Sequence, residues 1–401
     1  MIMNMAKIFT KVINKSFKTW TSFGKHKRTE FEFLIRRIYE NVHIPKHGSK
    51  YEHIYRELDI IISTLCCYLA SHSLFKDIEY ERTGSVEAGV KVGYPHEADY
   101  LLDVPQNIKP LKANHARQIL FKLTSLALSK DRYFCDLPNW EYLGTTEYKG
   151  IPGICINFQY SHCDEKVGVK ADLVLKHTVK STESFHLLKK AVRFLGYGRS
   201  HYVKCEEVYR LVGKSECDTG IIENNILKNL TDDQKMAFIV GKYLLHFLVT
   251  KNESVQRRNA LNVDENTALA LYGRKPCINS YLMRQCFIHL LICVHGTNME
   301  GQLSNGFLVL AFLDLVHFVV SGMTVLPHPL LANQTKQLVF DTYQKKHTCL
   351  ILGKIKLSLF NDKEFQDIRN YKLLNSTPNP LTILVDSTYQ TKKRCSWLCC
   401  T

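Results

Sequence analysis

The chain has few acidic residues for its number of basic ones, and the shortage is greatest at its start. Asp and Glu number 38 against 53 Lys and Arg, which gives a formal net charge of +15. No acid precedes Glu30, whereas seven basic residues do: Lys7, Lys11, Lys15, Lys18, Lys25, Lys27 and Arg28. A surplus of this size favours polyanionic partners, such as nucleic acid or an anionic membrane surface, over cationic ones.

The acid-free opening also has apolar residues at helical spacing, namely Ile8, Phe9, Val12, Ile13, Phe17 and Trp20. A basic amphipathic segment of this kind can be a mitochondrial transit sequence, a membrane-surface helix, a nucleic-acid arm or a solvated extension. The sequence leaves these four interpretations open.

Neither a signal peptide nor a disulfide framework is evident, although the chain has 14 cysteines. Cys66 and Cys67 fall on an apolar helical stretch, so we expect reduced thiols in a cytoplasmic protein. Residues 306–326 form an apolar run long enough to raise a membrane span. Asp314 and His317 lie near its middle, and a central Asp costs about 2.5–3.5 kcal/mol on insertion scales. A buried core helix is the better prediction.

Two carboxylates stand one residue apart at the start of an apolar run, at Glu97 and Asp99. In a strand, residues i and i+2 project from the same face, so these two side chains would lie together. Side-by-side carboxylates repel unless a cation lies between them. A third acid, Asp172, is embedded in the apolar run 167–175, where an unpartnered carboxylate would be costly. Residues 153–160 and 167–175 form a hairpin pattern that can bring Asp172 beside the first pair.

A Gly-Ser pair, Gly84–Ser85, precedes the acids. Its backbone N–H groups and hydroxyl can approach a phosphate closely because glycine has no Cβ. The three acids and the Gly-Ser turn together predict a site for a metal ion and a nucleotide.

Gly-Ser, then E-x-D on one strand, then a single Asp on a later strand is similar to the nucleotidyltransferase superfamily. More specifically, residues 49–360 resemble cyclic GMP-AMP synthase and its receptor-like relatives within the wider male-abnormal (Mab) family. The resemblance rests further on KYLLHFL (242–248), NSYLMRQCFIHLL (279–291) and LPHPLLANQTKQL (326–338), which match that family's helical lobe in order and spacing.

The resemblance implies an α+β, bilobal nucleotidyltransferase: a twisted mixed β-sheet with a spine helix, then a C-terminal helical lobe. We expect a basic N-terminal extension (1–48), a nucleotidyltransferase core (49–215), a helical lobe (216–360) and a C-terminal segment with a Cys-rich tail (361–401). The long helix predicted over 49–71 by its apolar stripe would be the spine. Thr231 is the predicted N-cap of a helix that begins after a break at 230–233.

The implied activity is ligand-activated joining of two NTPs (ATP, GTP or others) into a cyclic dinucleotide messenger of innate immunity. Glu97, Asp99 and Asp172 would hold two Mg²⁺ or Mn²⁺ ions. Gly84 and Ser85 would contact phosphates. The resemblance adds Lys242 as a phosphate contact, and Ser280 with Tyr281, whose ring would stack on a base. A linear 2′-5′ oligonucleotide synthase and a catalytically idle Mab-type scaffold are the alternatives.

The activating ligand in such proteins is commonly double-stranded nucleic acid along the spine. Candidate contacts are basic residues near the spine start and in a later segment: Lys46, Lys50, Arg56, Lys189, Lys190 and Arg193. Thr231–Asp233 stand where the DNA-sensing member has a Cys/His zinc insertion, so we expect no zinc and favour double-stranded RNA, which is recognised by shape and backbone. The resemblance also allows an oligomer that assembles on that ligand.

The last residues, 391–401, combine three basic residues with Cys395, Cys399 and Cys400. A prenylation signal would need Cys at position 398, which is Leu398. S-acylation beside the basic cluster would give peripheral membrane contact through the tail; a disordered tail with idle thiols is the other interpretation.

Overall fold

The computed structural model describes residues 2–44, 52–92, 97–104, 113–130, 137–162, 165–180, 207–213, 217–245, 278–295, 303–330 and 335–338, with isolated positions at 340, 345, 349, 352 and 353. These residues fall into two compact units. The sheet unit contains the described residues within 44–181 and 206–229, and the helical unit contains those within 1–43 and 230–376. The α+β class and the mixed sheet expected from the sequence are confirmed.

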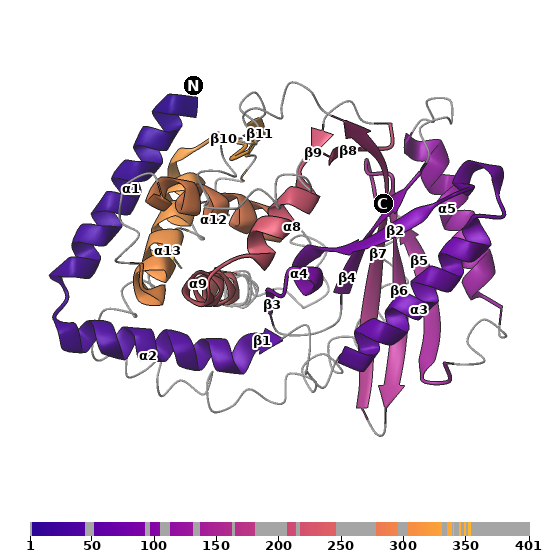
Figure 1. Ribbon diagram of the computed structural model, residues 1–401, viewed down its shortest axis with the longest axis horizontal. Helices are drawn as coiled ribbons and strands as arrows, with labels where there is room; N and C mark the ends of the chain where they lie inside the picture. Colours follow the sequence, from indigo (N-terminus) through magenta and orange to yellow (C-terminus); the bar gives the residue numbers. More distant parts are fainter. Residues whose placement is uncertain are drawn as a thin grey trace, which may run out of the picture. The chain divides into compact units, whose positions relative to one another are not determined.

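Within the described residues of the sheet unit, seven strands form one sheet. The order β2-β4-β7-β6-β5 is extended by β8 beside β7 and by β9 beside β8 (Figure 1). The bounds are β2 Glu79–Thr83, β4 Glu97–Asp103, β5 Trp140–Glu147, β6 Gly153–His162, β7 Glu165–Lys180, β8 Glu207–Leu211 and β9 Cys217–Asp218. The β4–β7 pair is parallel, and the other pairs are antiparallel. The predicted hairpin is therefore β6–β7.

One face of this sheet is covered by α3 (Glu52–Leu69) and α5 (Ala113–Leu128). The predicted stripe of α3 is buried there, with Leu58, Ile62 and Leu65 inaccessible to solvent. Strand residues alternate as period 2 requires. Ala98, Tyr100 and Leu102 of β4 point into this core, as do alternate residues of β6 and β7. The remaining strand positions, which include the acids, point to the opposite face.

Short elements connect these strands: η1 Ser73–Phe75, α4 Gly84–Glu87, β3 Lys91–Val92, and β1 His43–Ile44 at the unit boundary. The strand expected over 75–82 begins only at Glu79, because Phe75 is buried at the end of η1. Helix α8 (Gly220–Lys228) belongs to the sheet unit, whereas the sequence suggested the helical lobe from 216 onward. Side chains of α8 bond to β2 and α4, which explains this placement.

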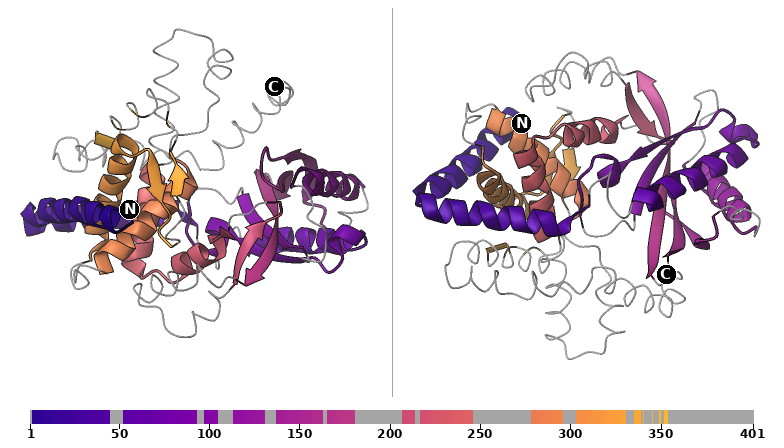
Figure 2. Two further views of the ribbon diagram at one scale, coloured as in Figure 1. Left: turned by 90° about the horizontal axis from the view of Figure 1, so that it is seen from above. Right: turned by 60° about the horizontal axis from the view of Figure 1, so that its bottom comes forward.

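The helical unit is built around α13 (Asn305–Gly322). Its other elements are α1 Ile2–Ser22, α2 Lys25–Val42, α9 Asp232–Tyr243, α12 Ser280–His295 and the antiparallel pair β10 Val325–Pro327 with β11 Thr335–Gln337. Both views of Figure 2 show the indigo helices α1 and α2 against the orange helices. Helix α9 begins at the predicted cap, where Thr231 and Gln234 form a reciprocal capping box.

The first two helices are not a separate extension in this structure, although the sequence suggested one over 1–48. Phe9, Ile13 and Trp20 of α1 are buried, and the Phe9 ring contacts the rings of His289 and Phe318. Ser16 Oγ donates a hydrogen bond to Asp314 Oδ2 at 2.6 Å. The polar group at the centre of α13 is thus satisfied inside the protein. Helix α13 is long and apolar enough to cross a membrane, and 72% of it is buried here.

Candidate metal and nucleotide site

The three predicted acids lie together on the face of the sheet opposite α3 and α5. Glu97 and Asp99 are on β4, Asp172 is on β7, and the parallel register sets Asp99 directly opposite Asp172. Each acid offers one oxygen atom within 4.8 Å of the others. Both strands are fixed in this register because their alternate residues are buried in the core on the other face. Sheet pairing, rather than a loop, therefore positions the carboxylates.

The Asp172 carboxylate is partly covered by protein. Its Oδ1 is buried and has no hydrogen-bond partner among the described residues. Burial raises the pKa of this carboxyl above its ordinary value, and hydrogen bonds from Tyr148 and Cys155 oppose the shift. Burial is the main cause that raises the pKa of the Cys155 thiol to about 12, and the negative charge of Asp172 is the second. A buried carboxylate oxygen without a donor is costly in a protein unless it serves as a ligand.

Lys91 is a buried cation beside the acids, and the sequence analysis missed it. Its Nζ donates to the Glu97 backbone carbonyl at 3.1 Å and lies 3.7 Å from Glu97 Oε2. Burial lowers the pKa of Lys91, while the charges of Glu97, Asp99 and Asp172 act in the opposite direction. A lysine between Val90 and Val92 was the available signal, because a charge inside an apolar run needs a partner.

The residues present fit a divalent cation. Carboxylate oxygens are the ligands that Mg²⁺ and Mn²⁺ prefer. Asp172 has one buried oxygen without a hydrogen-bond donor, and its carboxylate lies in a cluster with two others. The charge of Lys91 acts on all three carboxylates, and the charge of Lys170 acts on Asp172. Among the described residues, this is the group of His, Cys, Asp and Glu that the geometry assembles as potential ligands.

The Gly-Ser turn contacts the acids directly. Gly84 has φ +74°, a conformation that favours glycine. A Cβ built on Gly84 would overlap the Asp99 carboxylate. Backbone hydrogen bonds then close the turn, from Ala88 N to Gly84 O at 3.0 Å and from Val90 N to Ser85 O at 2.9 Å. Glycine at 84 therefore lets the backbone lie against the acid cluster.

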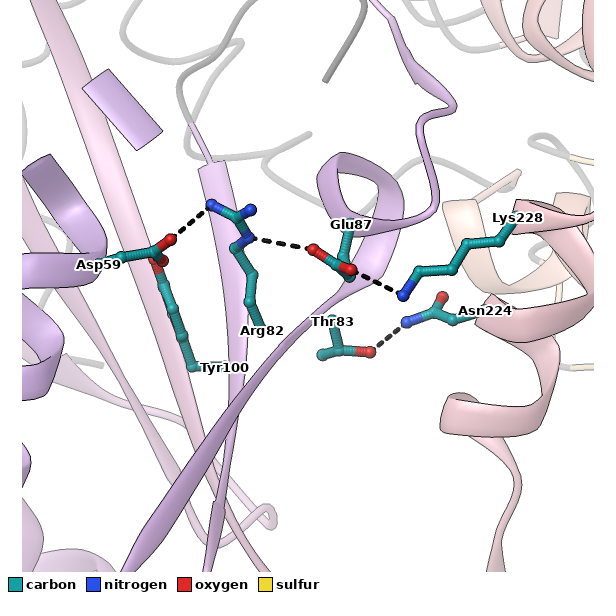
Figure 3. Close-up of polar contacts among 7 residues, drawn as sticks. All are labelled: Asp59, Arg82, Thr83, Glu87, Tyr100, Asn224 and Lys228. Atoms are coloured by element: carbon teal, nitrogen blue, oxygen red, sulfur yellow. Dashed lines mark hydrogen bonds and ion pairs between the residues drawn. The ribbon is translucent and has the colours of Figure 1, made fainter. Parts of the chain in front are cut away.

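A chain of ion pairs holds this turn in place (Figure 3). Arg82 on β2 contacts Asp59 of α3 at 2.9 Å and Glu87 of α4 at 3.3 Å, and Lys228 of α8 contacts Glu87 at 2.6 Å. The Tyr100 hydroxyl donates to Asp59 at 2.7 Å. We call Asp59, Arg82, Glu87 and Lys228 the turn network. A hydrogen bond from Asn224 to Thr83 runs beside it. The Gly-Ser turn is thus tied to three separate elements.

Lys242, Ser280 and Tyr281 belong to the helical unit, whereas the acids belong to the sheet unit. Lys242 is half-buried in the last turn of α9, and Ser280 is exposed at the first residue of α12. The Tyr281 ring has Lys336 Nζ 3.7 Å from its centroid and the Arg284 guanidinium at 5.9 Å. Tyr281 is thus a cation-binding ring in this structure, and stacking on a base remains a prediction.

Of the nucleic-acid candidates, Arg56 is exposed on α3. Lys46, Lys50, Lys189, Lys190 and Arg193 lie outside the described residues, as does the tail from 391 to 401.

In comparisons with known proteins, no protein-family model and no curated protein match the chain.

Proposed function

We propose that the protein is a metal-dependent nucleotidyltransferase of the cyclic GMP-AMP synthase-like type, with the bilobal fold of that superfamily. The observation that carries the proposal is the acid cluster on two adjacent parallel strands, with the glycine of a Gly-Ser turn packed against one of its carboxylates. A scaffold protein has no use for three gathered carboxylates of which one has a buried, unpartnered oxygen. The resemblance of the motifs supplies the reaction class.

In this proposal Glu97, Asp99 and Asp172 hold two ions. Bound there, Mg²⁺ or Mn²⁺ would neutralise charge on the triphosphate and activate the attacking hydroxyl. Asp172 would accept a hydrogen bond from the attacking ribose hydroxyl and take its proton as a general base. Gly84 and Ser85 present backbone N–H groups and a hydroxyl to the phosphates. Lys91 holds the Glu97 backbone and side chain in register.

The product we propose is a cyclic dinucleotide, made when double-stranded RNA binds. Purified full-length protein is incubated with four labelled NTPs and Mg²⁺ or Mn²⁺, alone or with duplex RNA or duplex DNA, and then treated with phosphatase. A phosphatase-resistant product formed only with RNA is the expected result. A phosphatase-sensitive oligomer would indicate the linear synthase. Product formed only with DNA would contradict the RNA assignment.

The assay is paired with Asp99→Asn, which we expect to lower product formation by at least about 100-fold because it removes a ligand charge without removing volume. Glu141→Gln is the matched control, since it removes one exposed carboxylate from the same sheet. Equal activity in the two variants would remove Asp99 from the site. Absence of both product and metal-dependent triphosphate binding in the unaltered protein would favour the scaffold.

A further inference from the structure

Helix α1 carries a row of lysines on its outer face. Lys7, Lys11, Lys15 and Lys18 are all exposed, and their spacing of four, four and three residues places them on one face of the helix. At about 1.5 Å per residue the row extends over about 16 Å. We call these four residues the α1 lysine row.

These four charges have no ion-pair partner among the described residues. No acid occurs before Glu30. Of the ion pairs between described residues, none includes a lysine of this row; the first along the chain joins His26 to Glu30. The other exposed residues of α1, Thr19, Thr21 and Ser22, are hydroxyl residues. The outer face therefore presents one sign of charge and no apolar side chain among its described positions.

The row is held in a fixed geometry by the rest of the helical unit. Like charges at i,i+4 destabilise an isolated helix by about 0.2–0.5 kcal/mol per pair. Burial of Phe9, Ile13 and Trp20 against α12, α13 and α2 offsets that repulsion. A polyanion that binds along α1 would meet four cations already aligned, so it would not have to order the backbone that carries them.

We propose that the α1 lysine row binds the phosphate backbone of duplex nucleic acid. Duplex DNA carries one phosphate charge per about 1.7 Å of axis, so the row is long enough to contact several phosphates. The proposal goes beyond nucleotidyl transfer and does not depend on it, since it concerns binding by the helical unit alone. It also places the contact on residues other than those suggested near the spine.

The structure favours nucleic acid over a membrane as the partner. Stable binding of an amphipathic helix to a bilayer needs its apolar face as well as its charges. The apolar face of α1 is buried inside the protein. Phe33 on α2 is 63% exposed, but the exposed charges along its face are of both signs, Glu30, Arg36 and Glu40, so this patch lacks the uniform positive charge that favours an anionic membrane.

The test is binding of labelled duplex RNA and duplex DNA to full-length protein, measured by fluorescence anisotropy between about 50 and 200 mM salt. The variant changes Lys7, Lys11, Lys15 and Lys18 to Gln, which keeps good helix formers on an exposed face. A control variant changes Lys76, Lys122, Lys130 and Lys166 to Gln. These four are also exposed, so the control removes the same net charge from the sheet unit.

We expect the row variant to bind duplex at least about 10-fold more weakly. The slope of log affinity against log salt should shrink by about one unit per lysine, whereas the control should change little. RNA and DNA arms show which duplex the row prefers. Equal weakening in both variants would overturn the proposal, because net charge alone would then explain binding. The same variants are also tested for binding to anionic vesicles. If the row variant loses vesicle binding without any change in duplex binding, the proposal is overturned in favour of a membrane.

Circular dichroism and the unfolding temperature of each variant separate a binding defect from misfolding. These readouts also keep the proposal apart from the proposed function. If the row variant loses duplex binding and Asp99→Asn retains it, the result supports nucleic-acid binding by the α1 lysine row, whichever reaction the protein catalyses. An unaltered protein that synthesises product but binds duplex independently of the row contradicts only the row.

Discussion

At the scale of single residues, Gly84 is placed where both backbone angle and space require glycine. Gly84→Ala adds a methyl group that meets the Asp99 carboxylate and forces a left-handed backbone on alanine. We expect a loss of about 2–4 kcal/mol in the free energy of unfolding, because strain of about 1–2 kcal/mol is joined by overlap. Metal-dependent triphosphate binding should also be lost. Chemical denaturation and nucleotide titration measure the two effects.

Gly150→Ala is the matched control, because Gly150 has φ +75° but open space around its Cβ position. It should show the strain alone and retain nucleotide binding. If both substitutions behave alike, then the contact between Gly84 and Asp99 has no part in the site.

Asp172 is a second residue with a measurable consequence, which is a pH dependence of stability. Burial raises the pKa of Asp172, so the folded protein keeps this proton at pH values where the unfolded chain has lost it. The free energy of unfolding therefore falls as pH rises from the ordinary carboxyl range through the raised pKa. In metal-free buffer at neutral pH, we expect Asp172→Asn to unfold at a higher temperature than the unaltered protein.

Added Mg²⁺ or Mn²⁺ should raise the unfolding temperature of the unaltered protein more than that of Asp172→Asn, because a ligand that binds only the folded state stabilises it. Glu141→Gln, at an exposed carboxylate, should leave both the pH dependence and the metal response unchanged. A metal-free Asp172→Asn protein that is less stable than the unaltered one would show that this carboxylate is satisfied by contacts other than a metal.

The sequence predicts the acids but not what surrounds them. Glu97 and Asp99 were paired by the period of a strand, and Asp172 was found by its apolar flanks. Lys91, Tyr148 and Cys155 are near these acids only because β3, β5 and β6 are brought together by folding. The apolar flanks of Lys91 indicate only that its charge needs a partner, and which acids supply that partner depends on how the strands pair.

At the scale of secondary structure, the turn network joins a short helix to elements that pack on the core. Arg82 bridges Asp59 and Glu87, and its side chain is only 16% exposed. Arg82→Leu leaves both carboxylates without their shared cation. We expect a loss of about 2–3 kcal/mol, below the value for fully buried pairs because Asp59 is partly solvated. Triphosphate affinity should fall as well, since α4 loses its connection to α3.

Lys176→Met is the matched control for this element. Lys176 is a buried cation that bridges Glu81 and Asp103 at 3.7 and 3.4 Å, away from the Gly-Ser turn. Its replacement should lower stability by a similar amount and leave triphosphate affinity unchanged. A common fall in affinity for both variants would mean that the turn network acts through general stability rather than by positioning α4.

Element types were predictable where one signal was strong. The apolar stripe predicted α3 to within about three residues at each end, and the cap at Thr231 predicted where α9 begins. The boundary near Lys228 was not predictable, because α8 is helical like the elements that follow it. The contacts of Asn224 with Thr83 and of Lys228 with Glu87, together with the hydrogen bond from Gly220 N to Asp218 of β9, join α8 to the sheet unit.

At the scale of the whole molecule, α1 and α2 are part of the helical unit's core rather than an attachment. Seven apolar residues of these helices are buried: Phe9, Ile13, Trp20, Phe31, Leu34, Ile35 and Ile38. Each contributes about 1.5–3 kcal/mol, and together they are comparable with the 5–15 kcal/mol of a typical domain. We expect a chain lacking residues 1–43 to aggregate or to lose cooperative unfolding of the helical unit, as seen by near-ultraviolet circular dichroism and size-exclusion chromatography.

The Lys-to-Gln variant of the α1 lysine row is the control, because it changes the surface of the same helix and keeps its buried side. It should remain monodisperse and unfold cooperatively. If a chain without residues 1–43 is soluble and unfolds cooperatively, then α1 and α2 are an extension, as the acid-free sequence suggested.

The parallel β4–β7 pair has a consequence for how the chain reaches its native state. The pairs β2–β4 and β5–β6–β7 each join strands that are near in sequence, whereas β4–β7 joins the two groups across a long separation. Contacts of this kind form late, because closing a long loop costs entropy before the contact is made. The acids are divided between the two groups, with two on β4 and one on β7. A partly folded chain in which β4 and β7 have not yet paired therefore contains no complete acid cluster, and a one-residue slip between these strands would turn one strand's acids to the other face.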